Sequence, residues 1–131
     1  MKLANFNLKN LLTGKYGEKL AKKYLIGLGY EIIKENYRAP VGEIDIIARE
    51  RGQIVFVEVK TRRSNLYGLP FEAVDNRKKQ KILKTALYYL KSQKLTQSVR
   101  FDIISIYIEG KNKRLEHIKD TIENNNYISN I

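Results

Sequence analysis

The chain has 131 residues, a formal net charge of +11 at pH 7 and no cysteine. This length suits a single domain that buries its own core, so we expect residues 1–131 to form one domain with its core over about residues 13–120. The absence of cysteine excludes disulfides and thiolate metal sites, and a single histidine, His117, excludes a histidine-rich zinc site. The high positive charge predicts a polyanionic partner, most simply nucleic acid.

Membrane insertion and secretion are not expected. No apolar run approaches the roughly 18 residues that a membrane span needs, and the first residues lack the apolar stretch and cleavage site of a secretory signal. We therefore expect a cytoplasmic protein with no membrane partner. Residues 1–12 are mixed in character and residues 124–131 are polar, so both ends are expected to be loosely attached.

The predicted elements follow one another in the order αβββαββ. Apolar spacing predicts a helix over residues 13–28, with Gly29 as its stop and an inward face of Leu20, Ala21, Tyr24, Leu25 and Leu28. A strand over 30–37 and a turn over 38–42 come next, then a hairpin of strands 43–49 and 54–62 and a loop over 63–70. A second helix is expected over 76–93, facing inward through Ile82, Leu83, Ala86, Leu87 and Leu90. A strand over 99–108 and a short edge strand over 115–118 complete an α/β fold with a mixed sheet between helices.

The hairpin carries acidic side chains in otherwise apolar strands. Residues 42–47 read Gly-Glu-Ile-Asp-Ile-Ile, and residues 55–60 read Val-Phe-Val-Glu-Val-Lys. A turn of two or four residues makes paired positions sum to 103, which sets Asp45 opposite Glu58 and Glu43 opposite Lys60. Two directly opposed carboxylates repel each other unless a cation lies between them. The hairpin therefore predicts a site for a divalent cation.

Oxygen ligands of this kind suit Mg²⁺ or Mn²⁺, which use one or two carboxylates and leave room for water and phosphate oxygens. Asp45 and Glu58 would supply that pair, and Lys60 would steer or deprotonate the attacking water. The alternative is an ordinary solvated hairpin face with a Glu43–Lys60 ion pair. Against it, the other face is wholly apolar through Ile44, Ile46, Ala48, Val55, Val57 and Val59, and a nearly buried hairpin makes unpaired carboxylates costly.

Other side chains extend this hypothesis. Glu18 flanks the apolar stripe of the first helix, so it either reaches the hairpin or acts only on the helix dipole. Candidate phosphate-binding residues, which alternatively form a solvated charged face, are Arg62, Arg63, Lys78, Lys79 and Lys81. Tyr67 either stacks on a base or packs in its loop. Asp102 is expected to form a strand-surface ion pair, and His117 to be structural or solvated.

The two hairpin segments, 42–49 and 55–62, resemble the YraN-like family of small bacterial proteins, and the likeness extends over roughly residues 14–120. That family is similar to archaeal Holliday junction resolvases within the restriction-endonuclease-like, PD-(D/E)xK superfamily. The resemblance implies an αβββαβ core in which Asp45 is the metal-binding aspartate, Glu58 and Lys60 form the E-x-K element, and Glu18 is the helix-borne acid. Ile44 stands where the motif name has proline.

The resemblance implies a Mg²⁺- or Mn²⁺-dependent DNA endonuclease, with branched or structured DNA as a substrate and a homodimer among the oligomeric states left open. In that function Asp45, Glu58, Lys60 and Glu18 are catalytic, and the three acids bind the metal. A rival hypothesis is a DNA-binding or adaptor protein that keeps the fold without turnover. A third is an RNA-processing factor, because nothing in the sequence distinguishes a reader of the 2′-hydroxyl.

Overall fold

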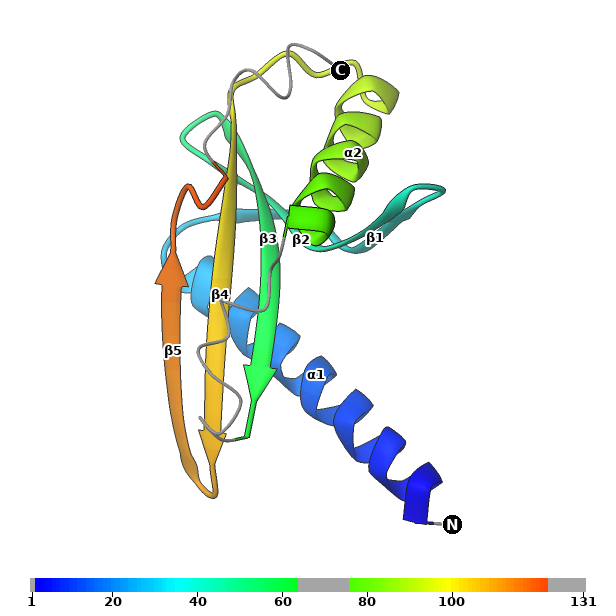
Figure 1. The fold of residues 1–131 in the computed structure, drawn as a ribbon. Coiled ribbons are helices and arrows are strands. Elements are labelled where there is room, and N and C mark those ends of the chain that lie inside the picture. Colours follow the sequence, from blue (N-terminus) through cyan, green and yellow to red (C-terminus); the bar gives the residue numbers. More distant parts are fainter. Residues whose placement is uncertain (1, 64–75, 123–131) are drawn as a thin grey trace.

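A five-stranded mixed sheet, with one helix packed on each face, organises the molecule (Figure 1). The computed structural model describes residues 2–63 and 76–122, with side chains from residue 12 onward. The elements are α1 (Lys2–Gly27), β1 (Glu31–Ala39), β2 (Gly42–Glu50), β3 (Gln53–Arg62), α2 (Asn76–Ser92), β4 (Val99–Glu109) and β5 (Asn112–Ile118). In the sheet the strands follow chain order, antiparallel except for the parallel pair β3 and β4. This is the predicted αβββαββ order and a restriction-endonuclease-like core.

Helix α1 is longer than predicted. It begins at Lys2, whereas the apolar spacing had placed its start near Thr13. Residues 2–12 contain no glycine or proline and include Leu, Lys and Ala, which favour helix without any packing. Periodicity detects only the part of a helix that packs, and in Figure 1 the N-terminal part of α1 projects past the sheet. None of the helices among the described residues is long and apolar enough to cross a membrane.

The C-terminal end of α1 is a Schellman turn around Gly29. Gly29 has φ +94°, a left-handed conformation that suits glycine, and the Tyr30 N–H donates to the Leu25 carbonyl at 3.0 Å. The predicted stop at Gly29 is confirmed. Leu28 lies beyond the last helical residue and is 54% exposed, so its assignment to the inward face was wrong.

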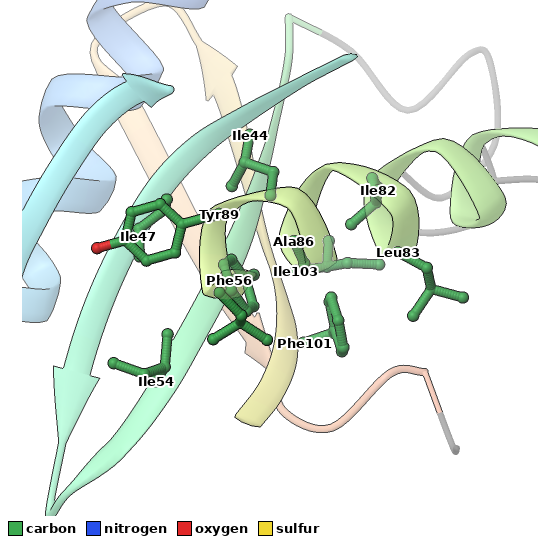
Figure 2. Close-up of a cluster of buried hydrophobic side chains, with 11 residues drawn as sticks. Ile44, Ile47, Ile54, Phe56, Ile82, Leu83, Ala86, Tyr89, Phe101 and Ile103 are labelled. Carbon is green, nitrogen blue, oxygen red and sulfur yellow. The ribbon is translucent and has the colours of Figure 1, made fainter. Parts of the chain in front are cut away.

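Each face of the sheet is covered by its own apolar cluster. The cluster beneath α2, shown in Figure 2, contains Ile44, Ile47, Ile54, Phe56, Ile82, Leu83, Ala86, Tyr89, Leu90, Phe101 and Ile103. The cluster beneath α1 contains Ala21, Leu25, Tyr30, Ile46, Ala48, Val55, Val57, Ile104 and Ile106. On α2, Tyr89 is buried while the predicted Leu87 is only partly so. The hairpin is therefore buried on both faces, and a solvated hairpin face is excluded.

Strand β2 bends at Asp45. Ile44 and Ile46 are two residues apart, which in a regular strand puts both side chains on one face. Instead Ile44 packs under α2 and Ile46 under α1, so the predicted common face was wrong for Ile44. Opposite the bend, Asn36 of β1 has φ +50°, between the partner positions Glu35↔Ile46 and Tyr37↔Ile44. The two strands thus change direction together, and the irregularity falls at the acidic residue.

Asp102 is buried, which corrects its prediction as a surface residue. Its carboxylate is 0% exposed and accepts hydrogen bonds from Arg100 Nε at 2.9 Å, Arg100 Nη2 at 2.8 Å and the Asp120 N–H at 3.1 Å. His117 Nε2 lies 2.7 Å from Asp102 Oδ2, and His117 Nδ1 lies 3.1 Å from the Tyr24 hydroxyl. A buried carboxylate with several donors is stable where an unpaired one is not. His117 is a structural residue, tying β5 to β4 and α1.

Gly17 lets α1 approach β3 closely. A Cβ atom at this position would overlap Thr61 Oγ1 and lie 2.9 Å from Thr61 Cβ. We predict that Gly17→Ala lowers the free energy of unfolding by about 1–3 kcal/mol in urea titrations, because helix or strand must shift. Gly14→Ala is the matched control, since a Cβ there has nothing within 4 Å. It should gain about 0.5–1 kcal/mol from helix propensity. Equal stability of the two variants would contradict the close packing.

Candidate active site

The candidate site lies where β2 separates from β3. The backbone pairs of β2 and β3 run from Glu50↔Gln53 to Ile46↔Val57 and sum to 103, as predicted for a turn of two or four residues. Beyond them the Val59 N–H donates to Asp45 Oδ2 at 2.8 Å instead of to a strand carbonyl. The side chain of Asp45 thus takes the place of a backbone acceptor at this point, and the expected backbone pairing of Asp45 with Glu58 does not form.

Glu43 lies outside the site. It pairs with Arg38 of β1 in the sheet, and its carboxylate is 64% exposed, 3.9 Å from Arg38 Nε. Its predicted position opposite Lys60 was wrong, because β2 and β3 have already parted and β2 continues with β1. An exposed ion pair of this length contributes little.

Helix α1 brings Glu18 to Asp45. Burial raises the pKa of Glu18, a hydrogen bond with the Asp45 side chain lowers it, and the charge of Glu58 raises it; the net shift is upward. Because α1 begins at Lys2, Glu18 is in the middle of the helix, where the dipole has little effect. The structure therefore brings Glu18 beside Asp45 instead of directing it away.

Asp45 holds its proton unusually tightly. Burial, the charge of Glu58 and the charge of Glu18 raise the pKa of Asp45 to about 7, against the opposing effects of the Val59 N–H and Lys60. Near neutral pH the carboxyl of Asp45 is therefore about half protonated, and its side chain forms a hydrogen bond with Glu18.

Glu58 is surrounded by lysines. Glu58 Oε1 lies 3.0 Å from Lys78 Nζ and 3.6 Å from Lys60 Nζ. Burial lowers the pKa of Lys60, as do a hydrogen bond with Lys78 and its charge, and Glu58 only partly opposes this. Burial lowers the pKa of Lys78 too, but the hydrogen bond with Lys60 and the charge of Glu58 outweigh burial and raise it overall. Lys60 is thus the lysine closer to a neutral amine.

The basic residues predicted to bind nucleic acid do not form one patch. Strand alternation directs Arg62, the last residue of β3, to the α2 face, whereas Arg63 turns to α1. Arg63 donates from Nε and Nη2 to Thr13 Oγ1 at 3.0 and 2.8 Å. Lys78 joins Glu58, whereas within the described ranges neither Lys79 nor Lys81 has an ion pair with the site carboxylates. Tyr67 lies outside the described residues.

Sequence reasoning missed Ser105. It is the register partner of Lys60 across the parallel pair β3 and β4. Its side chain is fully buried, and its hydroxyl has no hydrogen-bond partner in the part of the chain that the structure describes. Ser105 is the one polar residue in the run Ile-Ile-Ser-Ile over 103–106. A buried hydroxyl without a hydrogen-bond partner costs free energy. A single polar residue in an apolar strand was the sequence signal that could have identified Ser105.

The donor set suits a hard divalent cation. Asp45, Glu18 and Glu58 offer only carboxylate oxygens, and the raised pKa of Asp45 shows that its negative charge lacks compensation. In the part of the chain that the structure describes, no three acidic or histidine side chains are arranged to hold one ion. Asp45 contacts Glu18, whereas Glu58 forms ion pairs with Lys60 and Lys78. A cation would therefore draw Glu58 away from Lys78 or bind with two protein carboxylates.

Comparisons with known proteins cover most of the chain. A family model described as "Uncharacterised protein family UPF0102" matches residues 17–106, a range that contains Glu18, Asp45, Glu58 and Lys60. A UPF0102 protein of Syntrophus aciditrophicus is 48% identical over 116 residues, which is 88% of this chain and 91% of the relative. Another, from Caldanaerobacter subterraneus, is 49% identical over 107 residues, 81% of this chain and 88% of the relative.

Two solved structures are more distantly similar. The crystal structure of SSO0001 has a TM-score of 0.41 at 18% sequence identity, over 98% of this chain and 60% of that one. Pyrococcus furiosus SfsA, solved in complex with Ca²⁺, has a TM-score of 0.40 at 14% identity, over 88% of this chain and 65% of that one. The chain thus spans about two thirds or less of the length of each.

The pKa of Asp45 predicts a pH-dependent gain in stability for Asp45→Asn. A carboxyl whose folded-state pKa rises from 3.8 to about 7 contributes stability that is complete below pH 3.8 and is lost as pH rises through 7. The uncharged amide avoids that loss. We expect Asp45→Asn to be more stable than the native protein by at least about 1 kcal/mol at pH 8, with the difference vanishing near pH 4. Urea titrations with EDTA at pH 4, 6 and 8 measure this, with exposed Glu43→Gln as control. A gain independent of pH would refute the shift.

Proposed function

We propose that this chain, which belongs to the UPF0102 family, is a Mg²⁺- or Mn²⁺-dependent endonuclease that hydrolyses phosphodiester bonds in branched or otherwise structured DNA. The observation that supports the proposal is the junction where β2 and β3 part. There Glu18 of α1, Asp45 of β2, and Glu58 and Lys60 of β3 come together from separate elements.

The distribution of charge supports a nucleic acid as the substrate. The chain carries +11 overall, so it attracts polyanions. A cluster of partly buried carboxylates in such a chain is unfavourable for stability and repels phosphate. Such a cluster would serve a function if a cation bound to the carboxylates and to a phosphate together, because the ion would neutralise both anions. Lysines beside Glu58 add positive charge on the substrate side of the same junction.

The residues divide the chemistry among them. Asp45 and Glu58 would hold the cation, with Glu18 binding directly or through water. The bound cation would acidify a water molecule and offset charge that develops on the phosphate. Lys60, whose pKa is depressed by burial and by Lys78, is able to accept a proton from that water as a neutral amine. Lys78 stays protonated and pairs with Glu58 or a phosphate oxygen. The Val59 N–H keeps Asp45 oriented towards the junction.

A second candidate function is DNA binding without turnover. It is favoured by the ion pairs of Glu58, because Lys78 at 3.0 Å, with Lys60 beside it, already occupies the carboxylate that a cation needs. In that case the same lysines and Asp45 would be structural, and the positive surface would bind DNA as in any basic protein. Metal titration and cleavage separate the two functions.

Metal binding depends on the junction acids in the proposed function. We predict that Asp45→Asn and Glu58→Gln each weaken Mn²⁺ binding at least about tenfold in isothermal titration calorimetry, and that Glu18→Gln weakens it less. Glu43→Gln, an exposed acid on the same hairpin, is the control and should bind Mn²⁺ as the native protein does. Affinity unchanged in both Asp45→Asn and Glu58→Gln would eliminate the junction as a metal site.

Catalysis and DNA affinity should separate at Lys60. We predict that Lys60→Ala abolishes cleavage of four-way, flapped or linear DNA with Mg²⁺ or Mn²⁺ while lowering DNA affinity little, because one charge among many barely alters polyelectrolyte binding. Cleavage is followed on gels and affinity by anisotropy in EDTA. Lys23→Ala, on the exposed side of α1, is the charge-matched control. Cleavage retained by Lys60→Ala would remove it from the chemistry, and no cleavage by the native protein would favour binding without turnover.

A further inference from the structure

Three side chains form a row across the α2 face of the sheet, beyond the junction acids. The register pairs Arg62 of β3 with Tyr107 of β4, and Tyr107 with Arg114 of β5. Phe56 and Phe101 lie under α2, so alternation along β3 and β4 directs Arg62 and Tyr107 to that face. The guanidinium carbon of Arg114 lies 4.3 Å from the centre of the Tyr107 ring, so these two side chains are in contact, and Arg62 is the neighbour of Tyr107 in the register.

The row contains two hydrogen-bond donors without acceptors among the described residues. The Tyr107 hydroxyl and Arg62 Nε are both buried, and neither has a hydrogen-bond partner within residues 2–63 and 76–122. Buried donors without acceptors cost free energy and are uncommon in folded proteins. A hollow of about 190 Å³ adjoins the row and is lined by Tyr107, Glu109, Asn112, Lys113 and Arg114. The row thus combines unsatisfied donors, two guanidinium groups and adjoining space, which is what an oxyanion requires.

The row is aligned with the candidate active site. Glu58, Lys60 and Arg62 occupy alternate positions of β3, so they share the α2 face. At about 3.3 Å per residue, Arg62 lies roughly 13 Å along the strand from Glu58. A DNA strand with one phosphate at Glu58 and Lys60, continuing along β3, would bring a later phosphate to the row.

We infer that Arg62, Tyr107 and Arg114 form a binding site for a backbone phosphate of the DNA strand, away from the phosphate that is cleaved. This inference rests on the proposed function. Arg62 and the Tyr107 hydroxyl donate to the phosphate oxygens, and stacking on Tyr107 orients the planar guanidinium of Arg114. Phosphate contacts of this kind position the substrate without reading its sequence. The row sets the direction in which the strand leaves the active site.

The test measures DNA binding without metal, so it does not depend on cleavage. Fluorescence anisotropy with a labelled duplex and a labelled four-way junction, in EDTA over a series of salt concentrations, compares Arg114→Ala, Arg114→Lys and Tyr107→Phe with the Lys23→Ala control. We expect Arg114→Ala to weaken binding about tenfold and to reduce the salt slope on duplex DNA by about 0.9. Arg114→Lys should keep the slope but lose affinity, because lysine does not stack on the ring as arginine does.

Tyr107→Phe distinguishes a ligand contact from a structural role. Removing a hydroxyl that has no partner should leave the melting temperature unchanged or raise it, while DNA affinity falls. If Arg114→Ala and Tyr107→Phe both bind DNA as Lys23→Ala does, the row is not a phosphate site, although the proposed function stands. A lower melting temperature for Tyr107→Phe with unchanged affinity also overturns the inference. If the native protein does not bind DNA at low salt, the proposed function fails and the row's role with it.

Discussion

A single hydrogen bond, from the Val59 N–H to Asp45 Oδ2, fixes the geometry on which the candidate site depends. It satisfies a backbone donor that the β2–β3 ladder leaves unpaired once the strands part, and unpaired buried donors are costly. Because a side chain has replaced the neighbouring strand, β2 is free to bend with β1, and Ile44 turns from the α1 side to the α2 side. The bend that opens the junction and the orientation of Asp45 therefore have one cause.

The junction is electrostatically unfavourable without a cation. Burial and the charges of Glu58 and Glu18 raise the pKa of Asp45 to about 7, while Glu58 forms ion pairs with Lys60 and Lys78. Sites that bind or catalyse commonly lower the stability of the free protein in this way.

Helix α1 is held against the sheet at several places, and Glu18 lies between them. Arg63, directly after β3, donates to Thr13, Thr61 fills the space left by Gly17, and Tyr24 contacts His117 beside the buried Asp102. These contacts join the helix to β3 and β5 on both sides of Glu18. A side chain on a long helix would otherwise vary in position with every small tilt, so the anchoring accounts for the proximity of Glu18 and Asp45.

The sequence by itself determined the order of elements and the register that sums to 103, because these follow from local periodicity and turn chemistry. It left the turn open between two and four residues, and the pair Glu50↔Gln53 shows that the turn has two. It also singled out Asp45, Glu58 and Lys60, since charges stand out in apolar strands. Tertiary structure decided what depends on distant partners. Asp45 departs from backbone pairing because its side chain accepts the Val59 N–H. Asp102 is buried because Arg100 and His117 surround it. Lys78 contacts Glu58 because α2 connects the parallel strands β3 and β4. Periodicity records only how a segment relates to its own neighbours, so burial of a charge and the partner that permits it are settled when segments far apart in sequence pack together.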